Sequence, residues 1–427
     1  MAGLSLGVMQ DGQVIHQAHF GYRDVAARLP PNENTTYVIG SLTKGFSAAM
    51  AGILVDEGKL NWTTMLRDVV AGYHRDDRDP TLNVTIEDLL SHRTGFPGLD
   101  ALWLLSDGAV PVTHADAIAV LSTAPASKPL RSEFLYNNFA YEAVGQVIER
   151  ISGSKYENFL HERILAPLGM NHTYYTTPRP DVENAAKAYA CLLNMSYVEI
   201  ARPLEGHDIT MGPAGGMRSS VRDLLIWDKA IIDAARTQLG EEGPNDRPSY
   251  LQGNPLKQLP ELINAKINLP QISYREHSYA LGWTRAQLPQ NLGVPGTNYV
   301  TVGKGAGCSR SRTLLYHEGD IPGFYSFHAI LPEESSAVVV LGNSLSLAEP
   351  TKIIGALLLE TLIHSSVNTT ASLEAAHDNT NQGRKRASDV YDRLKKGKNM
   401  TTPINPLETY VGRCSDRYAN QDDLPIG

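Results

Sequence analysis

The sequence predicts an α/β (α+β) fold: a mainly antiparallel β-sheet flanked by helices, with a large inserted helical subdomain. Two observations predict it. Strand-like apolar runs stand near the N-terminus and again between residues 313 and 341, and the long stretch between them is mostly helix and loop. One sheet built from both ends satisfies this pattern. We expect residues 1–60 and 279–366 to form the sheet-containing half, 61–278 the helical subdomain, and 367–427 a polar linker and truncated C-terminal segment.

The N-terminal residues predict a β-hairpin that leads toward a helix. Apolar-rich runs at residues 4–9 and 14–19 flank Asp11-Gly12, and Asp-Gly is a strong signal for a hairpin turn. Residues 35–39 then lead into Ser41 and a helical run. The run ends near Gly58, and its apolar residues share one face, namely Phe46, Met50, Ile53 and Leu54.

Helix signals continue through the middle of the chain, and strand signals return after it. Thr85 and Asp88 form a capping box at the start of residues 85–90. Apolar residues from Tyr141 to Ile151 share a face closed by Ser152-Gly153. The remaining predictions are helices at 221–232 and 351–363 and strands at 313–316, 325–331 and 337–341.

Composition narrows the classes of function. A formal net charge of −8 over 427 residues lacks the concentrated basic surface that nucleic-acid binding needs. The stretch from about residue 367 to 406 is polar and charged, which is typical of a linker or disordered tail. The longest apolar runs are too short to span a bilayer. Three cysteines, Cys191, Cys308 and Cys414, form neither a disulfide framework nor a zinc pattern, so no metal or other cofactor is expected.

The cellular compartment stays open. No secretory signal is visible at Met1. Glycosylation sequons nevertheless hint at the secretory pathway. They begin at Asn34, Asn61, Asn83, Asn171, Asn194, Asn368 and Asn399.

Ser41 and Lys44 form the candidate catalytic pair. Residues at i and i+3 share one face of a helix, so both side chains can point into one site. A serine hydroxyl is a poor nucleophile until a neighbouring base accepts its proton, and a buried lysine with a lowered pKa can be that base. Ser41 would also stand at a helix start, where free backbone N–H groups favour negative charge.

The Ser-x-x-Lys motif alone is weak, because it recurs at Ser152-Gly153-Ser154-Lys155 in a predicted surface turn. The order of motifs is more specific. Ser41 is followed by Tyr136-x-Asn138 and then by His317-x-Gly319. This order and spacing resemble the serine β-lactamase, DD-peptidase and esterase superfamily. The segments that flank these motifs resemble its class C and esterase branch.

The resemblance covers roughly residues 3–365. It implies a β-lactamase/transpeptidase-like fold. Flanking segments match as well, at residues 89–95 (Leu-Leu-Ser-His-Arg-Thr-Gly), 165–170 (Leu-Ala-Pro-Leu-Gly-Met), 213–220 (Pro-Ala-Gly-Gly-Met-Arg-Ser-Ser), 279–283 (Tyr-Ala-Leu-Gly-Trp) and 317–324 (His-Glu-Gly-Asp-Ile-Pro-Gly-Phe).

The resemblance also implies roles for individual residues. Ser41 would form the acyl-enzyme, while Lys44 and Tyr136 would share general-base work, the tyrosine as a phenolate or hydrogen-bonded to the lysine. Asn138 would orient Lys44 and the substrate carbonyl. His317 would begin the third motif, on a strand beside the nucleophile. The backbone N–H groups of Ser41 and of Asp320, which follows Gly319, would form the oxyanion hole. We assign His92 and Gly215-Gly216 to turn architecture.

The chain departs from the family pattern in several places. Many members have Lys-Thr-Gly at the third motif, whose lysine attracts a substrate carboxylate; here Glu318 follows His317, which disfavours a β-lactam carboxylate. Leu130-Arg131 replaces a usual Pro-Gly turn before Tyr136. The chain begins almost at the first strand, where the family usually has a preceding helix. Residues 409–414 resemble the start of a C-terminal module.

The expected function is a serine hydrolase acting through an acyl-enzyme on a small-molecule ester, amide or peptide. An acyltransferase acting on a natural product is the alternative, since it uses the same acyl-enzyme. A non-catalytic binding protein on the same scaffold is the rival from another class. The sequence lacks the motifs of three other classes. These are a metallohydrolase centred on His317, an α/β-hydrolase, and a nucleotide-binding protein that would use the loop at residues 303–307. The sequence carries no signal for oligomeric state.

Overall fold

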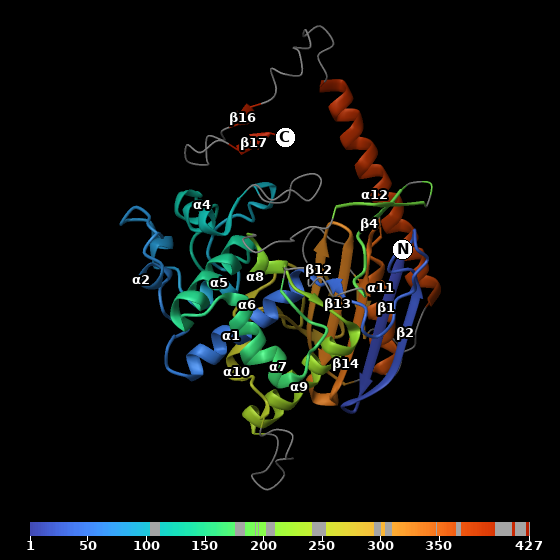
Figure 1. The fold of residues 1–427 in the computed structure, drawn as a ribbon, viewed down its shortest axis with the longest axis horizontal. Helices are drawn as coiled ribbons and strands as arrows, with labels where there is room; N and C mark the ends of the chain where they lie inside the picture. Colours follow the sequence, from blue (N-terminus) through green and yellow to red (C-terminus); the bar gives the residue numbers. More distant parts are fainter. Residues whose placement is uncertain are drawn as a thin grey trace.

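The computed structural model describes residues 1–102, 112–175, 184–192, 194, 196–201, 210–240, 253–293, 300–303, 310–346, 348–363, 369–397, 412–414 and 424–426. Its centre is an eight-stranded antiparallel sheet with the order β2-β1-β14-β13-β12-β9-β8-β7 (Figure 1). The strands are β1 (Gly3–Gln10), β2 (Gln13–Gly21), β7 (Ile267–Asn268), β8 (His277–Tyr279), β9 (Thr284–Leu288), β12 (Arg312–Ile321), β13 (Phe324–Leu331) and β14 (Ser336–Gly342).

Both halves of the chain build this sheet, as predicted. The N-terminal strand β1 pairs with the C-terminal strand β14, with Leu4 opposite Gly342 and Met9 opposite Ala337. The α/β class with a mainly antiparallel sheet is therefore confirmed. Smaller sheets surround it and are formed by β3 (Tyr37–Val38) with β6 (Arg218–Ser219), β10 (Gln290–Leu292) with β11 (Val300–Val302), and β15 (Ser344–Leu345) with β4 (Tyr189–Cys191) and β5 (Tyr197–Glu199).

Helices cover both faces of the sheet. On one face α1 (Thr43–Asp56) and α9 (Val221–Leu239) belong to the larger buried cluster, which also includes Val339 and Leu341 of β14. On the other face α11 (Pro350–Leu362) packs on a smaller cluster that includes Val338 and Val340. The side chains of successive residues of β14 thus point to opposite faces of the sheet, as the pleat requires.

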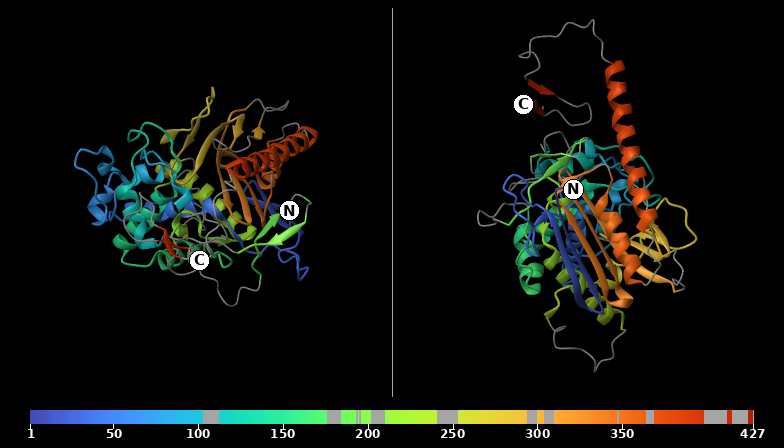
Figure 2. Two further views of the ribbon diagram at one scale, coloured as in Figure 1. Left: turned by 90° about the horizontal axis from the view of Figure 1, so that it is seen from above. Right: turned by 90° about the vertical axis from the view of Figure 1, so that its right-hand side faces the viewer.

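The remaining helices lie mostly beside the sheet, where Figures 1 and 2 show them as one block around α1 and α5. They are α2 (Leu66–Val69), α3 (Ile86–Leu90), α4 (Ala117–Thr123), α5 (Asn138–Ser152), α6 (Tyr156–Leu160), α7 (Ala166–Leu168), α8 (Gly212–Gly215) and α10 (Leu259–Leu262). Short 3-10 turns stand at Gly40–Leu42, Pro80–Asn83, Asp100–Leu102, His114–Asp116 and Pro332–Glu334, and a π turn at His161–Leu165.

Local signals in the sequence gave correct helix and turn positions. The capping box of Thr85 and Asp88 begins α3, and Gly153 closes α5 in the left-handed conformation. Two elements run further than predicted. Helix α9 continues to Leu239, and β12 continues from Tyr316 to Ile321, across residues whose polar side chains hid the strand pattern.

The polar stretch after residue 367 differs from the prediction of a linker or disordered tail. Residues Thr369–Gly397 form α12, a 29-residue helix that extends away from the body of the protein (Figures 1 and 2). Its sequence contains no proline and is rich in alanine, lysine and arginine, which favour helix whether or not the helix is buried. Of residues 409–414, only Gly412–Cys414 is described, as β16, which pairs with β17 (Leu424–Ile426).

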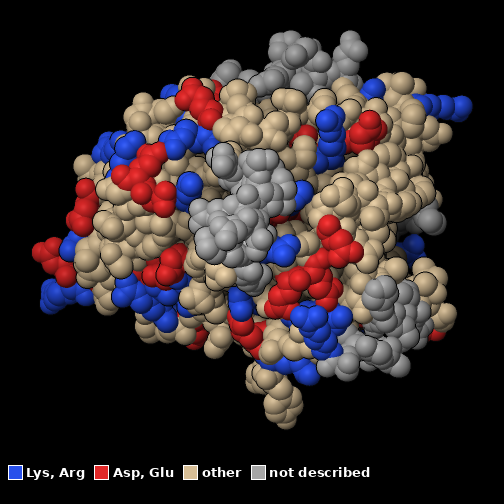
Figure 3. All heavy atoms as spheres, turned by 90° about the horizontal axis from the view of Figure 1, so that it is seen from below, with Lys and Arg blue, Asp and Glu red and all other residues tan. Residues whose placement is uncertain are grey.

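The surface carries charges of both signs. On the face drawn in Figure 3, lysine and arginine side chains lie among aspartates and glutamates. Among the described residues, the helices are either too short or too polar to cross a bilayer.

Candidate active site

Ser41 lies where the chain leaves β3 and turns through Gly40–Leu42 into α1. Strand β12 presses against this turn. Gly40 has a φ of +52°, and a Cβ there would lie 3.2 Å from the backbone N of Asp320. A Cβ on Gly319 would lie 2.2 Å from the carbonyl oxygen of Ile39. Both positions therefore require glycine, and their close approach brings the third motif against the serine.

Lys44 is completely buried one helical turn after Ser41. Its Nζ lies 3.1 Å from Ser41 Oγ, 2.7 Å from Asn138 Oδ1 and 2.8 Å from the carbonyl oxygen of Ala214 on α8. Burial lowers the pKa of Lys44 well below its usual range. The carboxylate of Asp100 opposes this shift only in part. The neutral amine is therefore favoured.

The three contacts orient that amine. A neutral amine has two N–H donors and one lone pair. The carbonyl oxygens of Asn138 and Ala214 can only accept, so they take the two donors. When the amine is neutral, its lone pair is left for Ser41 Oγ, 3.1 Å away, as a base for the serine proton requires.

Asn138 is held in one orientation by Asp100. Asn138 is the first residue of α5, and its Nδ2 donates to Asp100 Oδ1 at 2.9 Å. Because a carboxylate accepts and does not donate, this bond places the amide oxygen of Asn138 toward Lys44. Asp100 stands on the 3-10 turn Asp100–Leu102 and was not singled out from the sequence.

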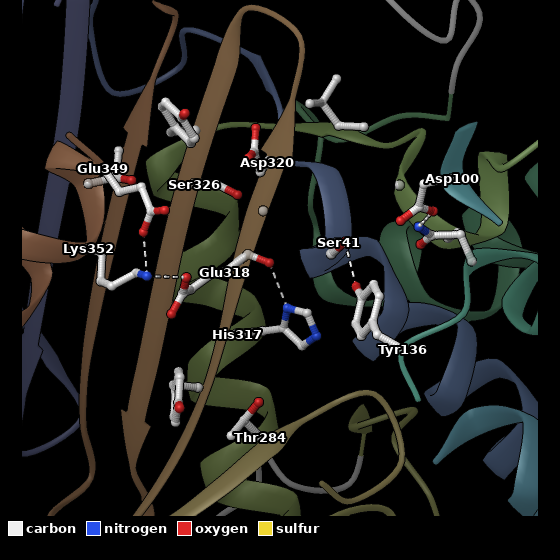
Figure 4. Close-up of a pocket in the computed structure, with 18 of the residues that line it drawn as sticks. Ser41, Asp100, Tyr136, Thr284, His317, Glu318, Asp320, Ser326, Glu349 and Lys352 are labelled. Atoms are coloured by element: carbon white, nitrogen blue, oxygen red, sulfur yellow. Dashed lines mark hydrogen bonds and ion pairs between the residues drawn. The ribbon is translucent and has the colours of Figure 1, made fainter. Parts of the chain in front are cut away.

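Tyr136 contacts Ser41 directly. Its hydroxyl donates to Ser41 Oγ at 2.7 Å, and Lys44 Nζ lies 4.7 Å from the centre of its ring (Figure 4). Burial raises the pKa of Tyr136 above its usual value, with the carboxylates of Asp100 and Glu318 acting in the same direction. The protonated phenol is favoured over the phenolate, and the hydrogen-bond partner of Tyr136 is the serine.

The segment that carries Tyr136 is fixed by its neighbours. Arg131, in place of the usual glycine, has a φ of +65° and forms two hydrogen bonds with the buried carboxylate of Asp88, at 2.9 and 2.8 Å. The substitution therefore keeps the left-handed turn and adds an ion pair.

His92 forms the turn that we predicted, with a φ of +58°, and also supports the site. Its Nδ1 accepts from the backbone N–H of Asn137 at 3.1 Å, and its carbonyl accepts from Leu135 at 2.8 Å. Its ring centre lies 4.2 Å from that of Tyr136 and 4.8 Å from that of Tyr279. His92 thus accepts hydrogen bonds from the backbone of the residues before and after Tyr136.

His317 is a neutral imidazole in this arrangement. Burial is the main cause that lowers the pKa of His317 to about 3. Its Nδ1 lies 2.7 Å from the carbonyl oxygen of Glu318, which fixes the proton on Nδ1, and its Nε2 accepts from the hydroxyl of Tyr279 at 2.9 Å. A neutral ring with both nitrogens occupied has no charge to attract a substrate carboxylate.

The edge of β12 faces the cleft beyond Tyr316, where its pairing with β9 ends. A two-residue turn joins β12 to β13, so Ile321 and Phe324 form the first hydrogen-bonded pair. The backbone N–H of Asp320 then points away from β13, and the glycine contacts above place its nitrogen beside Gly40.

A cavity of about 820 Å³ surrounds these groups. Figure 4 shows Ser41 and Tyr136 on one side of β12, with Glu318, Lys352 and Glu349 on the other. Lys352 is the one lysine or arginine among the described lining residues, and it pairs with Glu318 at 2.8 Å and with Glu349. In the described part of the chain, no group of three or more His, Cys, Asp or Glu side chains suited to a metal ion occurs.

The structure brings together every site residue proposed from sequence: Ser41, Lys44, Tyr136, Asn138, His317, Gly319 and Asp320. Three neighbours were missed: Asp100, Tyr279 and Lys352. Of these three, only Tyr279 lies in a segment that resembles the family, residues 279–283, so only Tyr279 could have been proposed from the sequence. The second Ser-x-x-Lys lies apart, in a turn where Ser152 Oγ accepts from Ser154 N and Lys155 is exposed.

Comparison with known proteins agrees with this geometry. The family model described as Beta-lactamase matches residues 1–362. The chain belongs to the β-lactamase family. Family membership accounts for the shared order of the motifs along the chain.

Relatives in the family share modest identity. The unguisins hydrolase ungD of Aspergillus violaceofuscus is 27% identical over 360 residues, which are 80% of this chain and 58% of that protein. Protein flp of Staphylococcus aureus is 24% identical over 375 residues, which are 87% of this chain and 65% of that protein. The chain spans less than two thirds of the length of these relatives.

Two solved structures show the same fold. The octameric penicillin-binding protein homologue from Pyrococcus abyssi has a TM-score of 0.66 at 26% identity, over 86% of this chain and 75% of that chain. The penicillin-binding protein from Bacillus halodurans has a TM-score of 0.60 at 21% identity, over 80% of this chain and 91% of that chain, a likeness of fold alone. The β-lactamase/transpeptidase-like fold is confirmed.

Proposed function

We propose that this β-lactamase-family protein is a serine hydrolase that acylates Ser41 with an ester or amide substrate. The carrying observation is the orientation of the buried Lys44 amine, whose two donors bind Asn138 and Ala214 and whose lone pair faces Ser41 Oγ. Lys44 accepts the serine proton as Oγ attacks the substrate carbonyl, and the backbone N–H groups of Ser41 and Asp320 bind the oxyanion.

Tyr136 then serves as the acid. Its protonated hydroxyl lies 2.7 Å from Ser41 Oγ, so it lies close to the bond that breaks and donates a proton to the leaving group. Lys44, now protonated, returns a proton to the tyrosine. In the second half of the reaction, water or an alcohol attacks the acyl-enzyme, and the same two residues act in reverse. Hydrolysis and acyl transfer thus share one machinery.

β-Lactams are poor candidate substrates on this account. Their recognition in many relatives uses the third-motif lysine, and here His317 is neutral and Lys352 is paired with two carboxylates. Uncharged or cationic esters and amides fit the cleft better.

Turnover of a panel of p-nitrophenyl esters, amino acid amides and β-lactams tests the proposal. We expect hydrolysis of at least one ester or amide by the native protein and its loss in Ser41→Ala. Ser152→Ala is the matched control, since it removes the serine of the second Ser-x-x-Lys. Full activity in Ser41→Ala sinks the proposal, and so does the absence of turnover across a broad panel. Addition of alcohols to the active enzyme then shows whether ester products form.

A further inference from the structure

The cavity that contains Ser41 and extends past β12 is lined by more acidic than basic side chains. Its carboxylates are Asp100, Glu133, Glu318, Asp320 and Glu349. From this imbalance and the contacts below, we propose that the site selects ester or amide substrates that carry an ammonium or guanidinium group. This inference rests on the proposed function and names its substrate class.

Lys352 does not neutralise this lining. It is 2% exposed and lies between Glu318 and Glu349, so its single charge faces two carboxylates. One oxygen of Glu318, Oε1, is buried and has no hydrogen-bond partner among the described residues. A buried carboxylate oxygen without a donor is costly, and a substrate N–H group would satisfy it.

Asp320 adds a further negative charge on the same face of β12. Residues two apart on a strand share a face, so the side chains of Glu318 and Asp320 point the same way. Asp320 remains exposed to the cleft. Burial is the main cause that raises the pKa of Asp320 to about 6, and the carboxylates of Glu349 and Glu318 add to the rise while Lys352 opposes it.

Lys128 pairs with Glu133 at 2.9 Å, and Lys352 is shared by Glu318 and Glu349, so the described lining still carries more carboxylates than cations. The third-motif His317 is neutral, and Lys44 is neutral when it acts as the base. The rest of the lining is largely apolar and suits the uncharged body of a substrate. It includes Phe134, Leu135, Pro270, Ile321, Pro322 and Leu345.

Three p-nitrophenyl esters with acyl chains of equal length, ending in a methyl, an ammonium or a carboxylate group, test the inference. We expect kcat/KM to be about tenfold higher for the ammonium ester than for the methyl ester at low salt, and lower again for the carboxylate ester. The preference should shrink as salt screens the charges. Equal values for the three esters, or a preference for the carboxylate, would overturn the inference.

Variants of the lining carboxylates test which residues cause the preference for the ammonium ester. Glu318→Gln and Asp320→Asn should each lower the ammonium-to-methyl ratio, and the double variant should bring it close to one. The ratio corrects for any general loss of activity, and the exposed Asp320→Asn is the variant least disturbing to folding. Glu162→Gln and Asp77→Asn, which remove exposed carboxylates elsewhere, should leave the ratio unchanged. A ratio that persists in the double variant contradicts the inference.

A binding measurement separates this inference from the proposed function. If no ester is turned over, the proposed function fails, and calorimetric titration of Ser41→Ala protein with hexylamine, hexanol and hexanoate decides the inference. Tightest binding of hexylamine supports it. Equal binding of all three, or tighter binding of hexanoate, overturns it.

Discussion

The amine of Lys44 is held against Asn138 by a 2.7 Å hydrogen bond to the side-chain oxygen. Asn138→Asp removes the Nδ2 donor to Asp100 and places a carboxylate beside the amine, and the added negative charge raises the pKa of Lys44. In the proposed mechanism the neutral amine is the base, so activity should rise as pH passes through that pKa. We expect the rising limb of kcat against pH to move to higher pH in the variant. A limb that stays in place, or moves to lower pH, would show that Lys44 is not the titrating base.

Tyr136 binds Ser41 through its hydroxyl, while its ring packs on His92. Tyr136→Phe removes the hydroxyl and keeps the ring, so kcat/KM should fall about 100-fold or more with the melting temperature little changed. Steady-state kinetics and thermal unfolding check this. Wild-type kcat/KM in Tyr136→Phe would exclude the tyrosine as the acid.

His92 positions the segment that carries Tyr136 without touching Ser41. His92→Asn tolerates the left-handed backbone but loses the ring that packs on Tyr136. We expect a loss of stability of about 3 kcal/mol, as for other large buried side chains that are truncated. We also expect a fall in kcat larger than any rise in KM. His161→Asn, at an exposed position, is the control. A destabilised variant with unchanged kcat would restrict His92 to a structural role.

His114 predicts a pH dependence of stability. Its ring lies between Glu142 and Glu149 of α5, and these carboxylates raise the pKa of His114 to about 10 despite its partial burial. The folded-state pKa exceeds the usual 6.5, so the stabilisation is fully present below pH 6.5 and is lost as pH rises toward 10.

His114→Gln should therefore cost more stability at pH 6 than at pH 9.5. Urea unfolding of both proteins at the two pH values measures this, with His161→Gln as the control. An equal loss of unfolding free energy at both pH values would contradict a stabilising ion pair of His114 with Glu142 and Glu149.

The sequence predicted the part of the site that depends on local geometry and motif order. Ser41 and Lys44 are neighbours because a helix brings i and i+3 together, and Gly319 was proposed from the resemblance of the His317-x-Gly319 motif. Asp100 and Lys352 could not be predicted, since they reach the site through tertiary packing of a short turn and of α11. The protonation state of Tyr136 also depends on burial that no local pattern reports.

The polar stretch after residue 367, predicted as a linker or disordered tail, is helical over Thr369–Gly397, and composition does not report this. Composition reports how much surface a segment can bury, and Thr369–Gly397 buries little: Leu373, Tyr391 and Leu394 are exposed. Helix propensity acts independently of burial, and it favours a helix there.

Acylation of Ser41 is the central claim, and intact-mass spectrometry tests it most directly. After brief exposure to a reactive p-nitrophenyl ester, the protein should gain the mass of one acyl group, and peptide mapping should place that group on Ser41. Ser41→Ala should gain no such mass, while Ser152→Ala should behave as the native protein does. An adduct that persists in Ser41→Ala, or turnover in the native protein through another residue, would contradict the account.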